Sequence, residues 1–157
     1  AVAMVFLDQG HFSKEDFAKF HPSGSLGASL LLKVDEIMRT GERFASVPSG
    51  STVQETIVEM TRAKAGSISI LAESGELVGI FTDADLRRAI LKDTGVFAKS
   101  IDDYMTRQPI VIESGSLVAD ALKVFEENKI DDLLVVNREN KPVGVIDGQD
   151  LPKLRII

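Results

Sequence analysis

The sequence contains no cysteine and no tryptophan, and only two of its 157 residues are histidines. A chain without cysteine forms neither disulfides nor zinc–thiolate sites, and it has no thiolate nucleophile. Neither histidine lies in a recognisable triad or metal-ligand motif. We therefore predict no metal site, no required cofactor and no catalytic activity for this chain by itself.

Long apolar runs and clusters of positive charge are also missing. No stretch approaches the roughly 20 apolar residues that cross a bilayer, and the first segment, AVAMVFLDQG, lacks the basic flank of a signal peptide. These features predict a cytoplasmic protein with no membrane partner, and we interpret its N-terminus as lying inside a longer protein. The net charge is −6 and the longest basic run is Arg87-Arg88, so no nucleic-acid partner is expected.

An internal repeat is the main feature that the sequence does contain. One copy runs from VDEIMRT to LVGIFTDADLRRAIL, and the other runs from IDDYMTR to VGVIDGQDLPKL. Three pairs of residues correspond between the copies: Met38 with Met105, Gly79 with Gly144, and Asp85 with Asp150.

Each copy predicts the element order β-α-β-β-α. In the first, Ser51 or Thr52 is expected to cap a helix, with Glu55 closing a capping box. In the second, the expected cap is Ser116. Matching apolar stripes follow the caps: Val53, Ile57 and Met60 in one copy, and Val118, Leu122 and Phe125 in the other. Because units this small bury little apolar surface, we predict that the two pack face to face around a shared core.

The segment Gly79-Ile80-Phe81-Thr82-Asp83-Ala84-Asp85 resembles the signature of the CBS-domain family, named after cystathionine β-synthase. In that family two repeats form a Bateman module. The resemblance implies an α/β (α+β) fold of two CBS repeats packed as a pseudo-two-fold pair. The expected boundaries are 34–92 and 98–157, and residues 1–33 are expected to be the tail of a preceding domain plus a linker.

The same resemblance implies a nucleotide site, with Thr82 facing a phosphate and Asp85 facing a ribose. A hydroxyl beside the free N–H groups of a helix N-terminus suits a phosphate, and a carboxylate accepts hydrogen bonds from ribose hydroxyls. Arg88, next to Arg87, is expected to add affinity for anions. A second interpretation stays open, in which Thr82 and Asp85 only cap a helix and the two arginines form a solvated face.

The second copy departs from this signature and reads Gly144-Val145-Ile146-Asp147-Gly148-Gln149-Asp150. Asp150 keeps the ribose position, but Asp147 stands where the first copy has Thr82. Because a carboxylate repels a phosphate, we predict unequal sites, with the Thr82/Asp85 side better suited to a phosphorylated nucleoside.

The N-terminal phrase FAKFHPSGSLG, followed by LLLKVDEIM, resembles the junction in the arabinose-5-phosphate isomerase family. There a sugar-isomerase (SIS) domain precedes a CBS pair. The family interconverts ribulose 5-phosphate and arabinose 5-phosphate for the synthesis of Kdo and lipopolysaccharide. The resemblance makes His21 a catalytic residue, but only in the intact parent enzyme, because the phosphate-binding part of the SIS domain lies upstream.

Two functions therefore remain open at the level of sequence. The first is a regulatory, nucleotide-sensing CBS pair that binds AMP, ATP or a CMP-type nucleotide such as CMP-Kdo. The second is a ligand-free assembly module of the same enzyme. In both, the partners expected are the chain's own SIS domain and further copies, as a CBS-pair dimer and as a tetramer of the parent.

Overall fold

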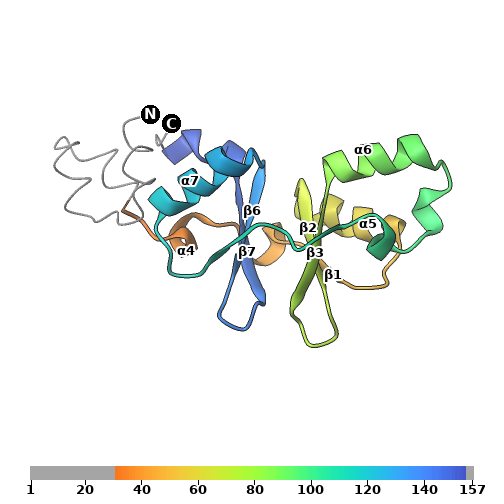
Figure 1. Cartoon of the computed structure of the whole chain (residues 1–157), viewed down its shortest axis with the longest axis horizontal. Helices are drawn as coiled ribbons and strands as arrows, with labels where there is room; N and C mark the ends of the chain where they lie inside the picture. The colour runs from red at the N-terminus through yellow and green to blue at the C-terminus, as the bar shows by residue number, and fades with distance from the viewer. Residues whose placement is uncertain (1–30, 155–157) are drawn as a thin grey trace.

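The structure is a computed structural model that describes residues 31–154 of the chain. Two small β-sheets stand side by side at the centre, and helices cover their outer faces (Figure 1). This arrangement confirms the predicted mixed α/β fold of two paired repeats. His21 and most of the predicted segment 1–33 lie outside the described residues.

The strands of the described chain form a four-stranded sheet in the order β1-β2-β3-β4 and a three-stranded sheet in the order β5-β6-β7. In each sheet the first strand is parallel to the second, and the second pairs antiparallel with the third. The parallel pairs need a crossover connection, which a helix supplies in each repeat. The strands are β1 Ser46–Pro48, β2 Ser67–Leu71, β3 Leu77–Thr82, β4 Thr106–Arg107, β5 Val111–Glu113, β6 Asp132–Val136 and β7 Pro142–Asp147.

The α-helices are α4 Val34–Ile37, α5 Val53–Ala63, α6 Asp83–Lys92 and α7 Val118–Asn128. The two crossover helices α5 and α7 each run for 11 residues and bury one apolar face. No helix within residues 31–154 has both the length and the apolar character that crossing a bilayer requires. Short 3-10 turns complete the fold: Gly41–Arg43, Val96–Ala98, Ile101–Asp103, Gly148–Asp150 and Pro152–Leu154.

The caps of the crossover helices differ between the repeats. Thr52 caps α5 as predicted, because its Oγ1 accepts a hydrogen bond from the Glu55 N–H (3.1 Å) and Glu55 closes the capping box. The prediction of Ser116 as the cap of α7 is wrong. Leu117 occupies the N-cap position, and the Ser116 carbonyl accepts the Val34 N–H (2.8 Å) instead. Helix α7 therefore begins without a side-chain cap.

The final element of the repeats also differs. The first repeat ends in the ten-residue helix α6, whereas the described part of the second ends in the two 3-10 turns 148–150 and 152–154. An α-helix that started at Gly148 would need the Pro152 nitrogen to donate to the Gly148 carbonyl, and proline has no N–H. The prediction of a final α-helix directly after the second repeat's last strand is therefore wrong for the described residues, and this repeat presents no α-helix N-terminus at the position of α6.

The segment that begins each repeat packs onto the other repeat. Val34 is fully buried among side chains of the second repeat. Ile101 is fully buried among side chains of the first, and it donates its N–H to the Ser51 carbonyl (2.7 Å). Each small unit is thus completed by the beginning of the other, so the stability of either repeat depends on both.

An aspartate fixes each exchanged segment, that is, the segment at Val34 or at Ile101 that packs onto the other repeat. Asp35 accepts hydrogen bonds from the Ser114 hydroxyl (2.6 Å) and the Gly115 N–H (2.7 Å), and the Ser114 bond lowers the pKa of its carboxyl. Asp102 accepts the equivalent bonds from the turn at residues 49–50 (2.7 and 3.1 Å). These contacts explain why both repeats begin with a β-branched residue followed by aspartate.

The glycine and methionine pairs noted in the sequence lie where each exchanged segment crosses a strand of the other repeat. A Cβ added at Gly144 would lie 2.5 Å from Met38 Sδ, and one added at Gly79 would lie 2.5 Å from Met105 Sδ. Only glycine leaves room for the methionine of the exchanged segment. The correspondence between the two repeats therefore reflects one packing contact that occurs twice.

Besides one core inside each repeat, a third cluster joins the inner faces of the two sheets. Its buried members are Leu77, Ile80, Leu134, Val136 and Val145. Burial of apolar area at this contact stabilises the pair by roughly 25 cal/mol per Å². The third core fixes how the repeats face each other and therefore fixes the clefts at the ends of the strands.

Candidate functional site

A large cleft lies between the two repeats, with a volume of about 960 Å³. The N-terminus of α6, the chain between β4 and β5, and the C-terminal end of α7 all contribute to its walls. Of the residues predicted to bind a nucleotide, Thr82, Asp85 and Arg88 line it together. Volumes of 300–1,000 Å³ are typical of ligand pockets, so the cleft has room for a nucleotide.

Thr82 and Asp85 also form a capping box. Thr82 Oγ1 accepts the Asp85 N–H (3.1 Å), and Asp85 Oδ2 accepts the Thr82 N–H (3.0 Å). The other carboxylate oxygen of Asp85 pairs with Arg88, whose side chain is 64% exposed. The capping role in the second interpretation is therefore present in the structure. The nucleotide-binding role of these side chains stays a prediction, and their position at the cleft is compatible with it.

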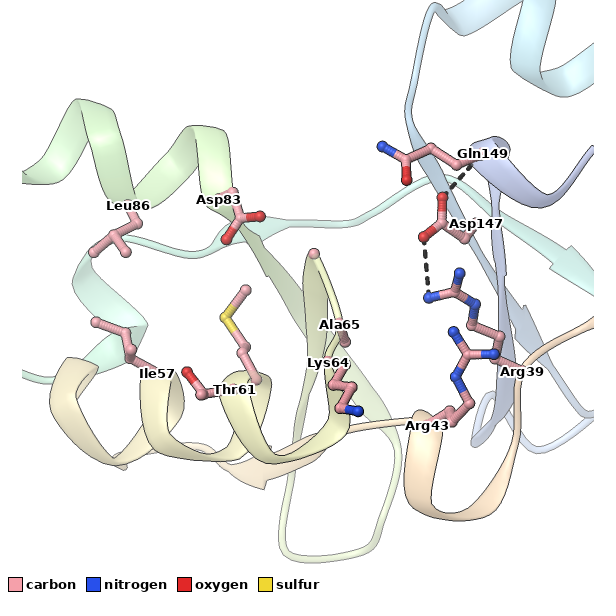
Figure 2. A pocket seen from close by; sticks show the side chains of 12 residues that line it. Arg39, Arg43, Ile57, Thr61, Lys64, Ala65, Asp83, Leu86, Asp147 and Gln149 are labelled. Atoms are coloured by element: carbon pink, nitrogen blue, oxygen red, sulfur yellow. Dashed lines mark hydrogen bonds and ion pairs between the residues drawn. The ribbon is translucent and has the colours of Figure 1, made fainter.

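A smaller cleft of about 480 Å³ lies where the second repeat would form the equivalent site (Figure 2). Figure 2 shows Arg39 and Arg43 side by side at this cleft, with the Arg39 guanidinium directed at Asp147. Arg39 Nη1 lies 3.1 Å from Asp147 Oδ2. Asp150 is not among the described residues that line either the large or the small cleft.

Arg39 holds Asp150 with two hydrogen bonds. Its Nε donates to Asp150 Oδ2 (2.8 Å) and its Nη2 donates to Asp150 Oδ1 (2.9 Å). These bonds raise the pKa of Arg39 and lower the pKa of Asp150. Lys153 Nζ also lies 3.4 Å from Asp150 Oδ1. Both oxygens of the carboxylate predicted to face a ribose therefore have cationic partners within the chain.

Sequence reasoning missed Arg39, although a signal was present. Arg39 follows Met38, whereas Thr106 follows the corresponding Met105. The second repeat, in turn, carries Asp147 where the first carries Thr82. An extra base and an extra acid at corresponding positions indicate an ion pair, but only if the first segment of one repeat lies on the other repeat.

Asp132 is a further acid that the sequence did not single out. It begins β6 and lines the large cleft. Burial raises the pKa of Asp132 to about 6, and the negative charge of Asp147 acts in the same direction, while a Ser67 hydrogen bond and Arg39 oppose the shift. An ionised carboxylate at this position costs free energy in the folded chain.

Asp132→Asn is expected to stabilise the chain at pH 7.5 by about 1–2 kcal/mol. The folded state binds the Asp132 proton more tightly than the unfolded state, so the wild-type free energy of unfolding falls as the pH rises from about 4 to about 6. The full shift corresponds to roughly 3 kcal/mol, which access of water to the cleft reduces. Urea unfolding at pH 4.5 and 7.5 measures the difference between variant and wild type.

The matched control is Asp131→Asn, which removes the same charge from the exposed neighbouring residue. It is expected to change the free energy of unfolding by less than about 0.5 kcal/mol at either pH. A gain from Asp132→Asn that is equal at both pH values would contradict a titrating buried acid.

Comparison with known proteins adds two kinds of similarity. The CBS domain family matches residues 34–92 and 101–154. The arabinose 5-phosphate isomerase of Pseudomonas aeruginosa is 42% identical over 151 residues, which is 96% of this chain and 46% of that protein. The chain spans about half the length of the curated relatives it matches.

Solved structures share the fold at lower identity. A CBS domain pair in complex with 5′-methylthioadenosine and S-adenosyl-L-methionine aligns with a TM-score of 0.70 and 22% identity, covering 80% of this chain and 96% of that one. CBSX2 in complex with AMP aligns with a TM-score of 0.68 and 20% identity, covering 79% and 96%. Both alignments extend over most of the described residues.

Proposed function

The chain belongs to the CBS-domain family. We propose that it is the nucleotide-sensing CBS pair of an arabinose 5-phosphate isomerase. The observation that supports sensing is the position of Thr82 and Asp85 at the N-terminus of α6, facing a cleft of about 960 Å³ between the repeats. A helix N-terminus offers free N–H groups and a positive dipole end to a phosphate. The Asp85 carboxylate is an acceptor for ribose hydroxyls.

The proposed ligand is a nucleotide, with its phosphate at Thr82 and Arg88 and its ribose at Asp85. AMP, ATP and CMP-type nucleotides such as CMP-Kdo share these chemical groups. Two structural neighbours are complexes with AMP and with ATP, which supports this class of ligand. The large cleft is preferred over the small one because Asp147 replaces the hydroxyl there and no α-helix N-terminus follows it.

The proposal extends to the parent enzyme. The relatives' similarity supports an enzyme that interconverts ribulose 5-phosphate and arabinose 5-phosphate in the cytoplasm, with His21 in the active site of the intact protein. Its partners are the preceding SIS domain and further copies, as CBS-pair dimers and an enzyme tetramer. Control of the isomerase by the CBS pair requires that the nucleotide bind two states of the enzyme with different affinity.

A thermal-shift screen of the 157-residue chain tests ligand binding directly. A nucleotide at a hundred times its Kd stabilises the folded chain by about 2.7 kcal/mol. For a chain of this size that corresponds to a rise in Tm of about 5 °C or more. The screen uses AMP, ADP, ATP, CMP, CTP and CMP-Kdo, with ribose 5-phosphate as the control that lacks a base. No shift with any nucleotide would contradict the sensing proposal.

A second candidate function, assembly without a ligand, is favoured by exposed apolar side chains on the outer helices. Leu91, near the end of α6, is 87% exposed, and Val58 on α5 and Phe97 beside it are exposed as well. Val58 and Phe97 line one surface groove together, and neighbouring exposed apolar groups indicate a protein contact. Sedimentation with and without nucleotide, together with the thermal-shift screen, separates the candidates, because an assembly module forms a dimer but binds no nucleotide.

A further inference from the structure

The two aspartates at equivalent positions of the repeats, Asp85 and Asp150, have ion-pair partners of different kinds. Asp85 pairs with Arg88, three residues along its own helix, and that arginine is mostly in solvent. Asp150 pairs with Arg39, which lies 111 residues away in the sequence and whose side chain is only 12% exposed. An arginine that lies mostly in solvent can leave its carboxylate easily, whereas a largely buried bidentate arginine cannot.

Arg39 is fixed by its backbone as well as by its side chain. Its N–H donates to the Val145 carbonyl (2.8 Å), and its carbonyl accepts the Val145 N–H (3.1 Å). The side chain therefore extends from the edge of β7 into the small cleft, where it also pairs with Asp147 (3.1 Å; Figure 2). One guanidinium in this position contacts both Asp147, which lines the small cleft, and Asp150, which does not.

A ribose at the position predicted for the second repeat would need the Asp150 carboxylate. Arg39 donates to both Asp150 oxygens at 2.8 and 2.9 Å, so its largely buried guanidinium lies against the edge of the carboxylate that a ribose would use. Displacing Arg39 would break its ion pairs with Asp147 and Asp150, all three side chains being largely buried, which costs free energy. A ligand that binds by its hydroxyls does not compensate for this loss.

We propose that Arg39 is a built-in occupant of the small cleft, so that the chain holds a single nucleotide, in the large cleft. The inference rests on the proposed function, because it concerns the number of sites for the same class of ligand. Arg39 thereby determines that the large cleft binds a nucleotide and the small cleft does not.

The test counts binding sites for AMP by isothermal titration calorimetry on the 157-residue chain. Wild type and Asp147→Thr are each expected to bind one AMP. Arg39→Ala combined with Asp147→Thr, which removes the carboxylate that repels a phosphate, is expected to bind two. Arg39→Met in the same Asp147→Thr background serves as a second variant that keeps the aliphatic stem of the side chain. Both variants keep the backbone pairing with Val145, and a cooperative thermal transition verifies that each is folded.

Arg43→Ala in the same Asp147→Thr background is the matched control. Arg43 lines the same cleft and carries the same charge, but it makes no ion pair or hydrogen bond with Asp150 in the described structure. Its removal is expected to leave the count at one, so a second site that appears in both variants would reflect general loss of positive charge and overturn the assignment to Arg39.

The remaining outcomes separate this inference from the proposed function. Two sites in wild type, or one site in both wild type and the Arg39 variants, would overturn the inference and leave nucleotide sensing intact. No site in wild type but one in the Arg39 variants would support the role of Arg39 and contradict sensing at the large cleft. No site in any variant would overturn both.

Discussion

Asp85→Ala is expected to lower the affinity for the nucleotide found in the thermal-shift screen by about 10- to 100-fold. Hydrogen bonds to a charged group contribute about 1.5–3 kcal/mol each, and 1.4 kcal/mol corresponds to a factor of ten. The Asp85 side chain lies at the large cleft with only 7% of its surface exposed. Calorimetric titration of wild type and variant measures the ratio of the two Kd values.

Asp85→Ala also removes half of a capping box, because the Asp85 carboxylate accepts the Thr82 N–H (3.0 Å). Glu55→Ala is the matched control, since Glu55 closes the same kind of box on α5 through the Thr52 N–H (3.4 Å) and does not line the large cleft. Both variants are expected to lose about 1 kcal/mol of stability. Only Asp85→Ala is expected to lose affinity, and equal affinities in the two variants would leave Asp85 with a capping role alone.

Gly144→Ala is expected to destabilise the chain by about 2–3 kcal/mol, seen as a lower midpoint in urea and a lower Tm. The added Cβ would lie 2.5 Å from Met38 Sδ and 2.9 Å from the Arg39 carbonyl oxygen. The methionine side chain can move, but the carbonyl belongs to the bridge between Arg39 and Val145 and cannot. Overpacking of this kind costs 1–3 kcal/mol, and here it also pushes the exchanged segment off the second repeat.

Two comparisons make this prediction specific. Gly66→Ala adds the same methyl group where its nearest neighbour, Asp83 Oδ2, lies 3.5 Å away, so its stability is expected to stay within about 0.5 kcal/mol of wild type. Combining Gly144→Ala with Met38→Ala should restore part of the loss, because the two side chains compete for one space. Strictly additive effects of the two substitutions would show that no such crossing exists.

The repeat, the order β-α-β-β shared by its two copies and the α5 capping box could be predicted because they depend on local patterns. Apolar residues at helical spacing bury one face of α5, and a threonine three residues before a glutamate caps it. The Ser116 prediction failed although the same local pattern was used. The backbone of the chain before Val118 pairs with the exchanged segment at Leu32 and Val34, and this tertiary pairing sets where α7 begins.

In the candidate site, too, some features follow from local sequence and others only from tertiary packing. The sequence by itself determined that Thr82 and Asp85 stand together at the start of a helix, because residues three apart meet across one helical turn. Only the tertiary structure decided that Arg39 holds Asp147 and Asp150, since the three come from opposite ends of the described chain. These ion pairs exist because the segment that begins the first repeat packs on the second, and no local pattern encodes which repeat a segment completes. The number of usable clefts is therefore a property of the folded pair and of its exchanged segments.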